Sequence, residues 1–156
     1  MSAPAVITPE ALLAHWQGHR RVTRRVIAAF PAEEFNSLSI GGMRPFSGLA
    51  SEILGMAVPT AHGVLTNDWK AYEEIKLSTQ AEALKKWDEQ TPELDRIFSQ
   101  IPIEKFQETV TAFGQWTMPV HDLFFYVIDN EIHHRGQGYV YLRALGIEPP
   151  AFWDRS

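Results

Sequence analysis

Apolar positions recur at spacings of three and four residues in four long segments of the chain, which is the period of an amphipathic α-helix. The first predicted helix begins at Thr8, a capping residue followed by Pro9, and ends at Phe30 before Pro31. Its semi-apolar stripe contains Leu12, Trp16, His19, Thr23, Val26 and Phe30. The opposite side carries Arg20, Arg21, Arg24 and Arg25. This pattern favours a solvated face paired with acidic residues over a phosphate site.

Two further helices are predicted in the middle of the chain. One spans residues 45–65, with a kink expected at Pro59. Its inward stripe contains Leu49, Glu52, Ile53, Met56 and Thr60. The other spans residues 79–100, where Pro92 indicates either a bend or the start of a second piece. Its inward positions are Leu84, Trp87, Leu94, Ile97 and Phe98. A carboxylate within an apolar stripe requires a partner, so Glu52 is a candidate functional residue.

The last predicted helix is the longest. It follows a stretch at 106–117 that is typical of an extended crossover or a short hairpin, and it runs from Met118–Pro119 to Leu145–Gly146. No repeat or flexible linker divides residues 1–156. The pattern therefore predicts one all-α domain, an antiparallel four-helix bundle with a long connection before the last helix.

This last helix is apolar almost all round. One stripe contains Leu123, Val127, Asn130, His134, Tyr141 and Leu145, and a second contains Phe125, Ile128, Ile132, Gly136 and Tyr139. We expect cover on both sides, and a second copy of the chain is the simplest cover for the outer one. Glu131 and Arg135 stand four residues apart on a flank, where an ordinary surface ion pair is the favoured interpretation.

Composition narrows the chemistry. The 156 residues include no cysteine, which excludes thiolate nucleophiles, iron–sulfur clusters and cysteine-ligated zinc. With 19 acidic and 14 basic side chains the formal charge is −5, so neither nucleic acid nor an anionic membrane is an expected partner. The first residues lack the pattern of a signal peptide, and no apolar run is long enough to span a membrane. We therefore expect a cytoplasmic protein.

Asn130 and His134 lie one helical turn apart in a core-facing row, and Glu52 faces them from another helix. Three such side chains form a possible metal site with positions left open for water or substrate. Periodicity alone favours the alternative, a buried polar cluster in which Glu52 accepts a hydrogen bond from His134.

The run from Asn130 to Gln137, Asn-Glu-Ile-His-His-Arg-Gly-Gln, and the run from Tyr139 to Pro150 closely resemble the C-terminal signature of the DinB/YfiT-like superfamily. Residues 43–56 resemble that family's second helix, and Gly114 its entry to the last helix. The resemblance implies a four-helix bundle, commonly a homodimer, that holds a divalent metal on three histidines. Relatives include thiol transferases, hydrolases and isomerases, and many have no assigned activity.

Matched residue by residue, the family's three ligand positions fall on Glu52, Asn130 and His134, of which only the last is a histidine. One nitrogen and two oxygens favour a harder ion such as Mn²⁺ or Mg²⁺ over Zn²⁺ or Ni²⁺, or no ion at all. On the same wall, Tyr141 or Gln137 is a candidate for orienting a substrate.

The other histidines are weaker candidates for metal binding. His133 forms an (i, i+4) pair with Asp129 but points about 100° away from His134. His15 and His19 have a spacing compatible with metal or with a plain surface pair. His62 lies too far along its helix, and His121 is expected to be exposed.

Two functions remain open from the sequence. One is a divalent-metal-dependent enzyme of thiol-transferase or hydrolase type, in which the ion activates a bound thiol or water. The other, narrowly favoured, is a relative with an altered or vestigial metal site that keeps its pocket and binds a small molecule.

Overall fold

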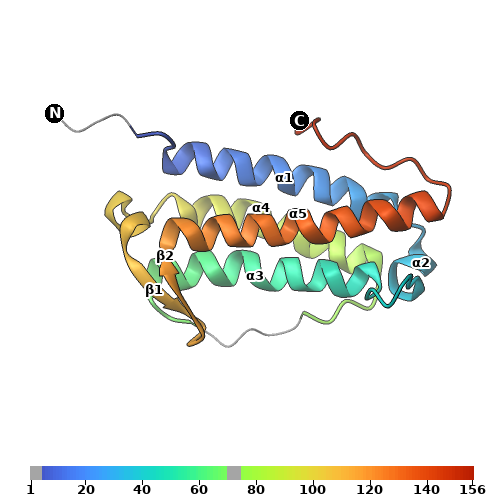
Figure 1. Ribbon diagram of the computed structural model, residues 1–156, viewed down its shortest axis with the longest axis horizontal. Helices are drawn as coiled ribbons and strands as arrows, with labels where there is room; N and C mark the ends of the chain where they lie inside the picture. Colours follow the sequence, from blue (N-terminus) through green and yellow to red (C-terminus); the bar gives the residue numbers. More distant parts are fainter. Residues whose placement is uncertain (1–4, 70–74) are drawn as a thin grey trace.

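Within the residues that the structure describes, 5–69 and 75–156, four long helices form the body of the protein in the computed structural model. They are α1 (Pro9–Ala29), α3 (Phe46–Thr66), α4 (Gln80–Phe98) and α5 (Val120–Ala144). Both α4 and α5 contact α1 and α3, so the four helices enclose a common core. In Figure 1, α1 and α5 run in one direction and α3 and α4 in the other. The predicted helix bundle is confirmed.

The helix ends follow the predicted signals. Thr8 caps α1 by accepting a hydrogen bond from the backbone N–H of Ala11, and Thr79 caps α4 in the same way. Both α3 and α4 continue past their internal prolines, so Pro92 does not start a second piece. Beyond α5, Gly146 has a φ of +73°, the left-handed conformation expected of its position.

Shorter elements connect the helices. The hairpin of β1 (Thr109–Ala112) and β2 (Trp116–Pro119) stands between α4 and α5, which confirms the hairpin over the extended crossover. Two short elements were not predicted from the sequence: the one-turn helix α2 (Ala32–Ser37) and the 3₁₀ turn η1 (Ile103–Gln107). No helix among the described residues is both long and apolar enough to cross a membrane.

The core consists of two apolar clusters with polar side chains between them. One cluster lies toward the hairpin and includes Trp16 and Phe124, and the other lies toward α2 and includes Phe46 and Trp87. Between them α1 and α5 bury a set of side chains that we call the polar layer: His19, Arg20, Thr23, Glu131 and Arg135.

The expected surface ion pair of Glu131 and Arg135 is wrong, because these side chains are only 1% and 4% exposed. The Oε1 atom of Glu131 lies 2.6 Å from Oγ1 of Thr23. Arg135 donates to the backbone carbonyl of His19 at 3.0 Å. The flank of α5 that carries Glu131 and Arg135 faces α1. The spacing of residues within α5 does not reveal this, because it depends on how α5 packs against α1.

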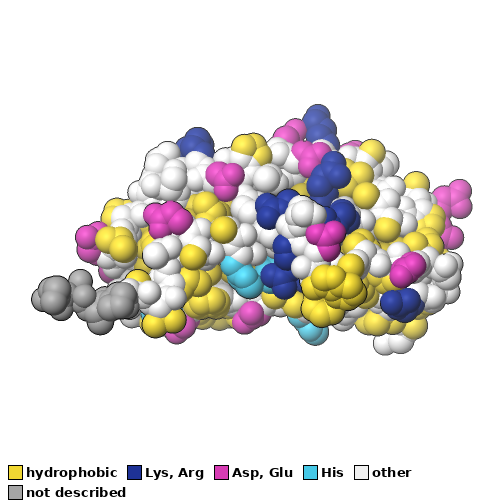
Figure 2. Space-filling model, turned by 90° about the horizontal axis from the view of Figure 1, so that it is seen from above, with side chains coloured by type: hydrophobic (Ala, Val, Ile, Leu, Met, Phe, Trp, Pro, Cys, Tyr) yellow, Lys and Arg dark blue, Asp and Glu magenta, His cyan; other side chains and the backbone are white. Residues whose placement is uncertain are grey.

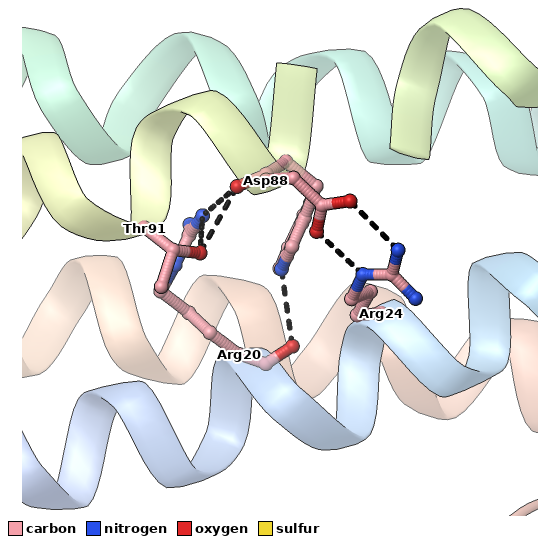
Figure 3. Close-up of polar contacts among 5 residues, drawn as sticks. Arg20, Arg24, Asp88 and Thr91 are labelled. Atoms are coloured by element: carbon pink, nitrogen blue, oxygen red, sulfur yellow. Dashed lines mark hydrogen bonds and ion pairs between the residues drawn. The ribbon is translucent and has the colours of Figure 1, made fainter. Parts of the chain in front are cut away.

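The four arginines of α1 also differ in their surroundings, as Figure 3 shows for two of them. Arg24 forms a bidentate pair with Asp88 at 2.6 and 2.7 Å, as predicted for a solvated face. Arg20 departs from that prediction, since it is 1% exposed and lies over the ring of Trp87, 4.3 Å from its centroid. Its guanidinium donates to the carbonyl of Trp87 at 3.2 Å.

The C-terminal segment lies along α1, as Figure 1 shows. Arg21 donates to the carbonyl of Arg155 at 2.7 Å, and Arg25 donates to the carbonyls of Asp154 and Ser156. Figure 2 views this side of the molecule, where basic side chains gather near the middle. These arginines thus hold the backbone of the C-terminal segment.

Candidate functional site

A direct contact joins α3 to α5 at the middle of the bundle. Nε2 of His134 lies 3.0 Å from Oε1 of Glu52, and His134 is 8% exposed. Glu52 stands on the inward stripe of α3 and His134 on the core-facing stripe of α5, so the predicted rows do meet. The structure therefore confirms the polar contact that helical periodicity favoured.

Arg44, in the loop before α3, completes this cluster. One guanidinium nitrogen lies 2.5 Å from Oε2 of Glu52, so each carboxylate oxygen has its own donor. Partial burial raises the pKa of Glu52, but the hydrogen bonds from Arg44 and His134 outweigh burial and hold the pKa below its usual range. Glu52 is therefore ionised at neutral pH.

The imidazole of His134 contacts oxygen at both of its nitrogens. Its Nδ1 lies 2.9 Å from Oε1 of Gln137, one turn further along α5. A ring that donates at both nitrogens carries two protons, and if the Gln137 amide is turned to donate instead, the single proton sits on Nε2. In both arrangements Nε2 of His134 donates to Glu52.

Tyr141 and Gln137 form hydrogen bonds that hold the members of this cluster in position. The Tyr141 hydroxyl, fully buried, lies 2.8 Å from the carbonyl oxygen of Arg44 and 3.1 Å from that of Met43. It fixes the backbone from which the Arg44 side chain extends. Gln137 orients the His134 ring. Both are positioning residues for the cluster.

Asn130, the third predicted ligand, points its amide toward a different residue of α3. Its amide nitrogen lies 3.2 Å from the sulfur of Met56. Among the described residues, no three His, Asp or Glu side chains converge as a metal site would require. The assignment of a metal to Glu52, Asn130 and His134 stays a prediction.

The remaining histidines have other neighbours. His19 is buried between Arg135 and Arg155, each 3.1 Å from one ring nitrogen. Burial and the two nearby guanidinium charges lower the pKa of His19 to about 3. His121 is half-buried, with Nδ1 2.8 Å from the carbonyl of Phe106.

A cavity of about 350 Å³ opens beside the cluster, between α3, α5 and the hairpin. Its polar lining consists of Arg44, Glu52 and Thr60. The apolar lining consists of Met56, Phe113, Trp116, Met118, Leu123 and Tyr126. A partly open, mostly apolar cavity with a few polar groups is the usual form of a small-molecule site.

Sequence reasoning missed two features of this cavity. Arg44 follows a glycine turn outside every predicted helix, and only its contact with Glu52 reveals its role. Phe113 and Trp116 form the aromatic wall of the cavity. The sequence predicted a hairpin at this position but did not indicate which helices it packs against. The signal in the sequence that pointed to this site was Glu52, a carboxylate within an apolar stripe that requires a partner.

The comparisons with known proteins agree with this architecture. The model of the DinB family matches residues 1–155. No curated protein sequence matches the chain. A DinB-like protein from Bacillus subtilis has a similar structure, with a TM-score of 0.74 at 20% identity over 93% of this chain and 99% of that one. A second, from Bacillus cereus, has a TM-score of 0.73 at 17% identity over 91% and 95% of the two chains. The chain therefore belongs to the DinB family.

Proposed function

We propose that this DinB-family protein binds a small molecule in the cavity beside Glu52 and His134 and does so without a resident divalent cation. The observation that carries the proposal is that the cavity opens onto Arg44 and Glu52, whose charges already neutralise each other. A guanidinium thus supplies the positive charge that a metal ion would bring to this carboxylate.

The donor chemistry of the three matched positions does not fit a resident cation. A metal ligand must offer a lone pair, and Nε2 of His134 carries a proton toward Glu52 in either ring arrangement. The second oxygen of Glu52 is bound to Arg44, whose charge opposes an approaching cation. A neutral Asn130 amide turned toward the Met56 sulfur adds no charge.

The cavity, by contrast, suits an organic ligand. Its size lies within the range of small-molecule pockets, and its aromatic wall offers large apolar area at little cost in conformational entropy. Arg44 is about half exposed, so it is accessible to a ligand entering from solvent. His134 is not among the lining residues and acts through Glu52.

Metal analysis of protein purified without an affinity tag tests the first half of the proposal. We expect far less than one ion per chain, and no rise in the midpoint of thermal unfolding when Mn²⁺, Ni²⁺ or Zn²⁺ is added. About one tightly held ion per chain would instead support a metal-dependent transferase or hydrolase.

Nuclear magnetic resonance of protein carrying ¹³C-methyl methionine tests the second half. Met56 and Met118 line the cavity, whereas Met43 packs against the apolar cluster near α2 and serves as an internal control. Adding small aromatic compounds should shift the methyl signals of Met56 and Met118 and leave that of Met43 in place. Equal shifts at all three would show nonspecific binding and contradict the proposal.

A further inference from the structure

The side chain of Arg44, at the polar end of the cavity, offers more hydrogen-bond donors than its contact with Glu52 uses. Both carboxylate oxygens of Glu52 are occupied, by Arg44 and by His134. A guanidinium carries five N–H donors, and among the described residues the Arg44 guanidinium forms one hydrogen bond, to Glu52. The remaining N–H donors of Arg44 can therefore bind a second acceptor, supplied by a ligand. The planar fork of donors on an arginine matches the two oxygens of a carboxylate.

A buried hydroxyl belongs to a second residue that lines the cavity, two turns beyond Glu52 on α3. Thr60 is fully buried and lines the cavity, and within the described part of the chain its Oγ1 has no hydrogen-bond partner. An unpartnered buried hydroxyl costs free energy that a ligand with its own polar group recovers. Thr60 therefore provides a second polar contact at a distance from Arg44.

The spacing between the two ends sets the length of the ligand. Glu52, Met56 and Thr60 stand at successive i+4 positions on one face of α3. Eight residues of α-helix span about 12 Å, so the backbone positions of Glu52 and Thr60 are roughly that far apart along α3. Between them the wall is apolar and rich in aromatic rings, which include Phe113, Trp116 and Tyr126.

From these three observations, and resting on the proposed ligand-binding function, we infer that the cavity takes an elongated monocarboxylic acid with an aromatic or other apolar body. Its carboxylate binds Arg44, and a hydroxyl at its far end pairs with Thr60. Glu52 and His134 hold Arg44 in place, and the positive charge of Arg44 disfavours a cationic ligand at this end.

The test uses 6-phenylhexanoate and its neutral primary amide as probes at pH 7, with affinity measured by calorimetry and location by the methyl signals of Met56 and Met118. We expect the acid to bind about tenfold more tightly than the amide, because a charge-assisted hydrogen bond is lost. This comparison uses the native protein, so it does not depend on the folding of a variant.

Two variants test whether the carboxylate of the probe binds Arg44. Arg44→Gln should weaken binding of the acid about tenfold and leave the amide unchanged. Arg96→Gln is the matched control, since Arg96 is exposed on α4, pairs with Glu93 and does not line the cavity. It makes the same change in net charge and should bind both probes as the native protein does.

Thr60→Val, which keeps the shape of the side chain, tests the far end. A probe with a terminal hydroxyl, 6-(4-hydroxyphenyl)hexanoate, should bind the native protein about fivefold more tightly than 6-phenylhexanoate, and the variant should abolish that advantage. Equal binding of acid and amide with shifts at Met56 and Met118 would overturn this ligand class and leave the proposed function standing. No binding by any probe would count against both.

Discussion

Glu52 and His134 contact each other directly, carboxylate oxygen to ring nitrogen at 3.0 Å, although 82 positions separate them in the chain. These are two of the three positions at which the resemblance to DinB-like proteins implies metal ligands. In this chain Arg44 also binds the carboxylate of Glu52, and the charges of these two side chains balance each other.

Restoring histidine at the two altered positions should create a metal site. The double substitution Glu52→His with Asn130→His supplies imidazoles beside His134 and removes the carboxylate that holds Arg44. At an ion concentration of 100 times Kd, binding adds about 2.7 kcal/mol to the free energy of unfolding. Thermal unfolding with and without Ni²⁺ or Zn²⁺ measures this effect, with Asn130→His alone as the control. A double variant that binds no better than the native chain would show that the ligand positions are misassigned.

The charge on Glu52 should make stability fall at low pH. Because its pKa is held below the usual range in the folded protein, the carboxylate stabilises the fold above the unfolded pKa of about 4.3, and this contribution is lost as the pH falls through the folded pKa. Glu52→Gln should therefore cost about 1 kcal/mol at pH 7 and almost nothing at low pH. Denaturant unfolding at several pH values tests this, and an equal cost at every pH would contradict it.

Glu131 should have the opposite dependence. Burial raises the pKa of this carboxyl against the nearby charges of Arg20 and Arg135. Its contribution is complete below the unfolded pKa and is lost as the pH rises through the folded one. Glu131→Gln should therefore gain stability relative to the native protein with rising pH, by at most about 1.4 kcal/mol per pH unit. The exposed control Glu104→Gln should run parallel to the native protein across the same range.

Two glycines on α5 offer a matched pair of substitutions. A Cβ on Gly138 would lie 2.6 Å from the ring of Phe46 on α3, whereas a Cβ on Gly136 meets nothing within 4 Å. Gly138→Ala should destabilise the protein by about 1–3 kcal/mol through overpacking. Gly136→Ala should stabilise it by about 0.5–1 kcal/mol, because alanine loses less backbone entropy in a helix. Denaturant midpoints for the two variants should move in opposite directions.

A second copy of the chain remains the proposed cover for the outer face of α5. Of the predicted outer stripe, Phe125 is 38% exposed, but Ile128 is only 1% exposed and packs in the core. The face that the structure leaves exposed also carries Tyr126 and Val140, at 51% and 53%. Light scattering should give twice the mass of one chain, and Val140→Asp should reduce it to a single chain. Ile103→Asp, at an exposed apolar position on η1, should leave the mass unchanged. A native protein that is monomeric at high concentration would refute the proposal.

The sequence allowed the bundle and the meeting of Glu52 with His134 to be predicted, because both follow from the helical period and from capping residues such as Thr8 and Thr79. The surroundings of Arg44 and Glu131 were not predictable in this way. Arg44 belongs to a loop, and Glu131 lies on a flank whose burial depends on the rotation of α5 against α1. The long helices and one contact between them were predictable, whereas the short elements α2 and η1 and the packing of loop and flank residues were not.

The polar layer has a consequence for how the helices can slide along one another. Moving α1 against α5 by one helical turn, about 5.4 Å, would bring Glu131 away from Thr23 and Trp16 and against apolar side chains. Apolar contacts between the two helices, such as that of Trp16 with Phe124, would also be lost, but an apolar side chain meets other apolar side chains after the shift. A buried carboxyl tolerates it poorly, because its lost partners are not replaced. The layer thus sets the axial register of the bundle, much as a single buried polar residue does in a coiled coil.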